Sequence, residues 1–243
     1  MYTLYKKEIL TFLNSLIGYI VVGVFLLFNG LMIWVLPFET NLLDYGYSTL
    51  DSLFIIAPWV YLFLIPAITM RSFADEKKAG TIEFLLTKPI SELQIVLAKF
   101  FANVTLVVFS LLPTLIYFYS VYQLGNPKGN IDTGGMWGSY IGLLLLGAAY
   151  VSIGVFSSSI TDNQIVAFII CICLCLVMCY GFETISAFEF LGKVDDFILS
   201  LGINEHYKSL SRGVVDTRDV IYFFSVIALF TLFTKTVLES RKW

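Results

Sequence analysis

Long stretches without a charged side chain alternate with short polar segments along the whole chain. The charge-free stretches cover residues 9–38, 52–70, 100–127, 133–161, 163–182 and a shorter 220–234. A helix that crosses a membrane needs about 20 mostly apolar residues. The pattern therefore predicts an all-α integral membrane protein with six transmembrane helices, over 14–36, 52–70, 100–124, 138–160, 165–183 and 219–237.

Composition agrees with this pattern. Hydrophobic residues make up 58% of the 243 residues and charged residues only 14%, whereas a soluble domain carries about 25% charged residues. The chain has no internal repeat and no low-complexity tract that would divide it. We therefore expect residues 1–243 to form a single transmembrane domain.

The distribution of Lys and Arg predicts the orientation. With six helices, both termini lie on one side of the membrane, and that side holds ten of the 15 basic residues. Short cytoplasmic loops are enriched in Lys and Arg, so this side is expected to be the cytoplasm. The sequence thus predicts a multi-pass membrane protein with both termini cytoplasmic, and the family resemblance described below implies that the membrane is the bacterial inner membrane.

Two further segments have the pattern of short helices at a membrane surface. In residues 2–12, apolar side chains alternate with Lys6, Lys7 and Glu8, which favours an amphipathic helix before the first span. On the opposite side, apolar residues recur at helical spacing at Val194, Phe197, Ile198 and Leu201. This outer segment is too short to span, so we expect a helix that enters the outer leaflet without crossing it.

Residues 71–99 form the largest predicted cytoplasmic loop. Gly80 should end one short helix, and Ile82, Leu85 and Leu86 then share one face of a second. Ser91, with Gln94 three residues later, is typical of a capping box that starts the helix of the third span. Periodicity alone leaves two alternatives equally open: the apolar face docks on a partner, or it rests on the lipid surface.

A motif in this loop resembles the signature of ABC-2 type transporter permeases, E-x-x-x-G-T-[IL]-E-x-L-L-x-x-P…K. The matching residues are Glu76, Gly80, Thr81, Ile82, Glu83, Leu85, Leu86, Pro89 and Lys99. The resemblance implies that residues 80–89 form a coupling helix whose apolar face enters a groove on a separate ABC ATPase. It also implies that the N-terminal helix is an elbow helix. A second ATPase contact would then be Thr161, Asp162, Asn163 and Gln164.

Residues 204–223 resemble the corresponding stretch of the GldF family, the permease subunits of gliding-motility ABC transporters. That resemblance implies a GldA-like ATPase partner, which would bind ATP and Mg²⁺. It also implies a second, GldG-like membrane subunit with an extracytoplasmic domain. An alternative from another class stays open, because the sequence shows no solute pathway. In it the chain passes no substrate and transmits ATPase motion to an extracytoplasmic partner.

The chain lacks the residue sets of common enzymes. It contains no G-x-x-x-x-G-K-[ST] motif, so ATP hydrolysis is assigned to the partner and no cofactor to this chain. A lone histidine, His206, cannot form a zinc site by itself. The four cysteines all lie in the fifth span, where Cys171, Cys175 and Cys179 share one helical face. We interpret the cysteines as packing residues. For the chain as a whole we expect no catalytic residue and no metal site. We expect the membrane lipid to be a partner, and we expect no nucleic-acid partner.

The predicted topology can be tested by labelling single cysteines in a variant without the four native ones. In intact cells, an impermeant maleimide should label a cysteine at position 129 and not one at position 78, because the first is outside and the second cytoplasmic. Labelling at position 78 in intact cells would contradict the orientation.

Overall fold

The computed structural model describes residues 1–46, 48–86, 89–187 and 195–240, with only the backbone at positions 17, 45 and 86. All regular structure in these ranges is helical, as predicted. In chain order the elements are α1 Tyr2–Leu13, α2 Leu16–Trp34, α3 Leu42–Tyr45, α4 Asp51–Thr69, α5 Arg71–Lys78, α6 Ile82–Leu86, α7 Glu92–Leu111, the 3₁₀ turn η1 Leu112–Thr114, α8 Leu115–Leu124, α9 Thr133–Ile160, α10 Gln164–Leu176, the π-helical turn η2 Val177–Gly181, α11 Phe182–Ser186, α12 Asp195–Leu199, α13 Ile203–Ser211 and α14 Thr217–Glu239.

Five helical segments in the described residues are long and apolar enough to cross a membrane. A sixth span results if the pair Tyr2–Leu13 and Gly18–Trp34, bent by 66°, counts as one. The segment Asp51–Lys78 is longer than its predicted span, because it continues as helix beyond the apolar stretch, whereas Glu92–Leu124 begins at the Ser91 cap as predicted. Helical backbone bonds are satisfied within the segment, so a helix need not end where its apolar residues end.

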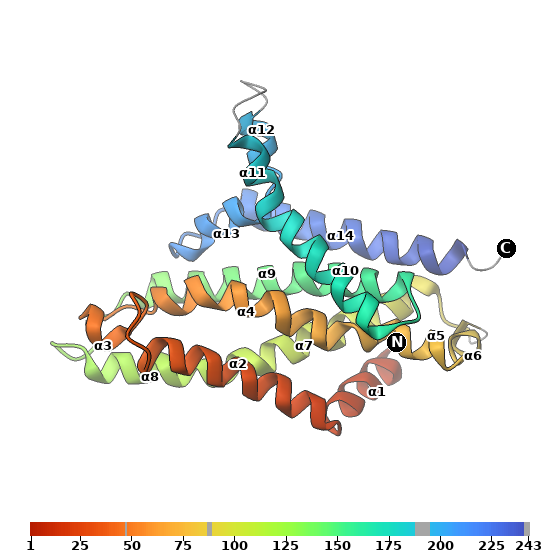
Figure 1. The fold of residues 1–243 in the computed structure, drawn as a ribbon, viewed down its shortest axis with the longest axis horizontal. Coiled ribbons are helices and arrows are strands. Elements are labelled where there is room, and N and C mark those ends of the chain that lie inside the picture. Colours follow the sequence, from red (N-terminus) through yellow and green to blue (C-terminus); the bar gives the residue numbers. More distant parts are fainter. Residues whose placement is uncertain (47, 87–88, 188–194, 241–243) are drawn as a thin grey trace.

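The long helices form a bundle with two distinct ends (Figure 1). One end carries α1, α5, α6 and the end of α14, and we call it the α6 end. The other carries α3 and the end of α8, and we call it the α3 end. Helices α10 and α11 run obliquely across the bundle and leave it at the top of the view. The predicted loop 71–99 and the turn 161–164 therefore lie at the same end of the molecule.

Helix α9 is the centre of the bundle, and its glycines permit close approach by its neighbours. A Cβ at Gly147 would lie 2.9 Å from a methyl group of Val107 in α7. At Gly138 it would lie 2.4 Å from the backbone oxygen of Gly213, and at Gly154 it would overlap Thr69 of α4. Small residues let helices in membranes pack backbone to backbone, where lipid supplies no hydrophobic driving force.

At the α3 end, α13 is tied to two long helices. Tyr207 donates its hydroxyl hydrogen to the backbone oxygen of Phe54 in α4, at 2.7 Å. Burial, with a smaller effect of Tyr180, raises the pKa of Tyr207, so the hydroxyl keeps the proton that this bond requires. The ring of His206 stacks on Tyr222 at 3.9 Å and lies 2.7 Å from an Asp219 carboxylate oxygen, both on α14. His206 is thus a packing and hydrogen-bonding residue between helices.

The expected outer helix exists but is shorter than predicted. It is α12, Asp195–Leu199, with Phe197 64% exposed, while Val194 lies outside the described residues. The backbone turns at Gly202 before α13 begins. The prediction for the cysteines is confirmed: Cys171, Cys175 and Cys179 are buried on one face, and Cys173 is exposed.

The close contact of α9 with α4 predicts that Gly154→Ala destabilises the chain by about 1–3 kcal/mol, because the added methyl group overlaps Thr69. The matched control is Gly23→Ala on α2, where an added Cβ meets no atom within 4 Å. Thermal unfolding in detergent should give a lower Tm for Gly154→Ala alone. Equal midpoints for the two variants would refute the proposed close packing.

Candidate functional site

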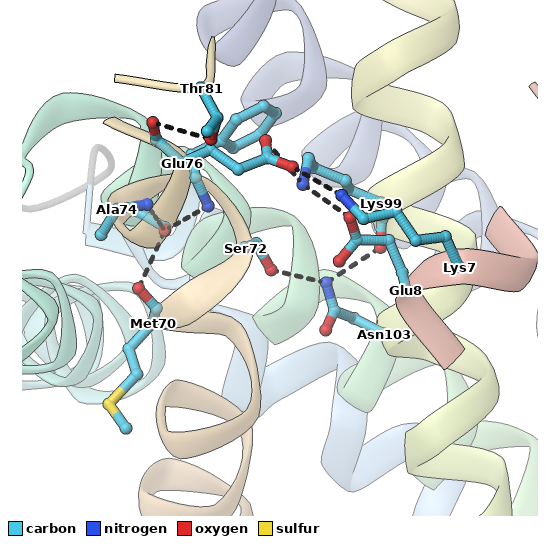
Figure 2. Close-up of polar contacts among 11 residues, drawn as sticks. Lys7, Glu8, Met70, Ser72, Ala74, Glu76, Thr81, Lys99 and Asn103 are labelled. Atoms are coloured by element: carbon cyan, nitrogen blue, oxygen red, sulfur yellow. Dashed lines mark hydrogen bonds and ion pairs between the residues drawn. The ribbon is translucent and has the colours of Figure 1, made fainter. Parts of the chain in front are cut away.

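The junction of α4 and α5 is held by one serine of α9. The Ser158 hydroxyl accepts hydrogen bonds from the backbone N–H groups of Phe73, at 2.9 Å, and Ala74, at 3.1 Å. It donates to the backbone oxygen of Met70 at 3.0 Å. Figure 2 shows these bonds around the first turn of α5. The serine satisfies backbone groups that a helix start leaves unpaired, so α5 is anchored to the centre of the bundle.

A buried lysine joins α5 to the N-terminal helix. The Lys99 ammonium on α7 lies 2.9 Å from a carboxylate oxygen of Glu8 on α1 and 3.0 Å from one of Glu76 on α5. Lys7 also contacts Glu76, at 3.4 Å. The Lys99 side chain is only 1% exposed, whereas that of Lys7 is 61% exposed. We call Lys7, Glu8, Glu76 and Lys99 the Lys99 cluster (Figure 2).

The surroundings of the Lys99 cluster compensate the buried charge. The ammonium lies 5.0 Å from the centre of the Phe73 ring, a distance at which a cation is attracted to an aromatic face. One turn along α7, the Asn103 amide donates to the Ser72 hydroxyl and to the Lys99 backbone oxygen, both at 2.9 Å. Three helices, α1, α5 and α7, are thus fixed to one another at the α6 end.

The predicted break at Gly80 is confirmed. Gly80 has φ = +68°, a left-handed conformation that favours glycine, and its N–H bonds to the backbone oxygen of Lys77 at 3.1 Å. The Thr81 N–H bonds to the Glu76 backbone oxygen at 2.9 Å, which closes the end of α5. The five-residue helix α6 begins directly afterwards. At the other side of the loop, Ser91 accepts from the Gln94 N–H and caps α7, as expected.

The orientation of α6 differs from the prediction. Ile82 is buried and joins the core of the bundle, and Leu85 packs partly against that core. The side chain of Leu86 lies outside the description, while Phe84 is 73% exposed and Glu83 is also exposed. The expected docking face is therefore directed largely at the chain's own bundle, because the nearest apolar surface available to it is that core. Pro89 is exposed after α6.

Glu76 pairs with basic residues of its own chain. Its side chain is 14% exposed and both of its oxygens contact lysines of this chain. Lys7 lies far before Glu76 in the chain and Lys99 lies far after it, so local periodicity could not indicate that they pair. Lys7 and Glu8 were missed as site residues for the same reason; their place on an amphipathic helix was the available clue.

The second predicted contact, residues 161–164, lies beside α5. The Asn163 side chain caps α10 by accepting from the Ile165 N–H at 2.9 Å, and the Thr161 hydroxyl accepts from the Asn163 N–H at 3.1 Å. The Gln164 amide donates to the Asp75 carboxylate. Asp162 is exposed in the turn. Both predicted cytoplasmic segments are thus brought together at the α6 end, with α5 between them.

The family of the chain follows from comparison of its full length. The family model described as ABC-2 family transporter protein matches residues 2–238. The chain belongs to this family. A search of curated proteins finds no match. As a member of the ABC-2 family, it is a multi-pass membrane subunit of an ABC transporter, and the family implies an ABC ATPase as its partner.

The Lys99 cluster predicts a strong effect of Lys99→Met. This variant removes the buried cation that both the Glu8 and the Glu76 carboxylates contact and leaves only the exposed Lys7 near Glu76, which should cost about 3 kcal/mol of unfolding free energy. Adding Glu8→Gln and Glu76→Gln should restore much of the loss. Lys7→Met is the matched control and should cost less than about 1 kcal/mol, because that ion pair is exposed. The measurement is thermal unfolding of the purified variants, and equal effects of both lysines would contradict the assignment.

Proposed function

We propose that this chain is the permease subunit through which a separate ABC ATPase drives transport across the bacterial inner membrane, with α6 and the turn 161–164 as the ATPase contacts. The α6 end is then cytoplasmic, which agrees with its excess of Lys and Arg. Gliding motility is the proposed process, on the resemblance of residues 204–223. The partners proposed with it are a GldA-like ATPase and a GldG-like second membrane subunit.

The observation that supports this proposal most directly is the exposed surface of α6. Phe84 presents a large apolar side chain at the α6 end, 73% exposed, next to the exposed carboxylate of Glu83. Aromatic residues are enriched at the centre of protein–protein contacts, and the rim around them is polar, which fits Phe84 as an anchor and Glu83 as a rim residue. Because α6 follows a helix that is bonded to α9, α1 and α7, a force on this surface passes directly to the bundle.

Phe84→Asp and Glu83→Lys should weaken binding of the partner ATPase. Burial of a Phe side chain stabilises by about 1.5–3 kcal/mol, so Phe84→Asp should lower the affinity at least about tenfold. Leu85→Asp is a less suitable probe, since Leu85 also packs against the core of its own bundle. The measurement is co-purification of the ATPase with each variant, together with the ATPase activity of each complex.

The matched control is Val214→Asp, which changes an equally exposed apolar residue, 65% exposed, in the segment between α13 and α14. It should leave ATPase binding unchanged. If Phe84→Asp and Glu83→Lys bind and activate the ATPase like the parent chain, α6 is an interfacial helix and the proposed contact is wrong.

A further inference from the structure

Two cavities adjoin beneath the bend between α1 and α2. Figure 1 shows the bend between the two helices, from which α1 extends toward the α6 end and α2 toward the α3 end. A polar cavity of about 210 Å³ lies between α1, the α4–α5 junction and α7. An apolar cavity of about 310 Å³ lies between α2 and α7. Phe12 and Leu106 line both of them, so the polar space at the helix bend and the apolar slot along the bundle are neighbours that share these two side chains.

The polar cavity contains a cationic side chain that the described part of the chain does not satisfy. Its other charged residues all have partners in the chain: Lys7 and Lys99 pair with Glu8 and Glu76, and Asp75 accepts from Gln164. The Nε of Arg71, in contrast, is buried and has no hydrogen-bond partner within the described residues. A guanidinium keeps its charge at any ordinary pH, so an unpaired buried N–H of this group is costly. The geometry of its donors matches a carboxylate or a phosphate, and of these two anions a membrane phospholipid supplies the phosphate.

The apolar slot has the composition and the length for a hydrocarbon chain. Its lining includes Leu13, Val22, Gly23, Leu26 and Phe109, and it contains no charged residue. From Gly18 to Leu26 it follows α2 for about 12 Å, at 1.5 Å per residue. Gly23 contributes no side chain, and a Cβ there would meet no atom within 4 Å. The absence of a side chain at this position leaves the slot open.

We propose that this chain binds a membrane phospholipid beneath the α1–α2 bend, with the lipid phosphate on Arg71 and one acyl chain in the slot between α2 and α7. A water-soluble phosphate compound would use only the polar cavity. The adjoining apolar slot distinguishes a lipid from such a compound, because only a lipid carries both groups. The site is separate from the proposed ATPase contacts, since no described residue of α6 or of the turn 161–164 lines either cavity.

The test is native mass spectrometry of the purified full chain with added dioleoyl phosphatidylglycerol, whose phosphate is the only charge of its headgroup. The parent chain should bind one lipid tightly. Arg71→Gln should lower the affinity at least about tenfold, whereas Lys78→Gln, which removes an exposed charge from the same helix, should not. Inorganic phosphate at the same concentration should not compete.

Two variants of α2 test the slot separately. Gly23→Leu places a side chain in the open space of the slot and should displace the acyl chain, again lowering the affinity at least about tenfold. Val24→Leu is the control, because Val24 is 59% exposed and outside the slot. Thermal unfolding without lipid shows whether each variant is folded. If Arg71→Gln does not fold, lipid binding by Gly23→Leu is the test of the proposal.

Three results would overturn the proposal. The first is no specific lipid bound to the parent chain. The second is retention of the lipid by folded Gly23→Leu, which would mean that the lipid is only part of the surrounding bilayer. The third is full competition by inorganic phosphate, which would make the polar cavity a site for a soluble anion.

Discussion

A lysine whose side chain is 1% exposed can be retained in a membrane protein only where its charge is compensated, and this constraint organises the α6 end. Lys99 meets two carboxylates from two other helices, one on the N-terminal helix and one on α5. Removing water from a charge costs several kcal/mol, so this position is tolerated only while both partners are in place. The compensation thus ties α1, α5 and α7 together at this end.

The same end is connected to the rest of the bundle by a continuous mechanical path. Residues Asp51–Lys78 form one helical segment, so α5 is the continuation of a long helix. Ser158 bonds its first turn to α9, and Gln164 and Lys77 add bonds between α5 and the end of α9 and start of α10. A rigid-body shift of α5 would therefore move α4, α9 and α10 together. Packed helices transmit small shifts because their interfaces do not deform continuously.

Much of the fold could be predicted from the sequence, because charge-free stretches of membrane length have few alternatives to helix. The helix break at Gly80 and the helix cap at Ser91 could also be predicted, since a left-handed turn and a helix cap depend on local chemistry. The candidate site could be predicted from the sequence only in part. The pairing of Glu76 with Lys99 and Lys7 joins distant segments, and the inward direction of Ile82 depends on the core it meets. Neither leaves a signal in local periodicity. The role of the α9 glycines in close helix packing likewise could not be predicted, because it depends on which helices contact them.

We propose that an ABC ATPase contacts α6, which follows the helix that the Lys99 cluster holds in place. Hydrogen–deuterium exchange of the backbone amides tests it most directly, in the purified chain alone and in complex with its partner ATPase. The account predicts that the amides of residues 82–86 become protected in the complex, while those of 203–211 at the α3 end exchange at an unchanged rate. Unchanged exchange over 82–86 in a complex that hydrolyses ATP would contradict it.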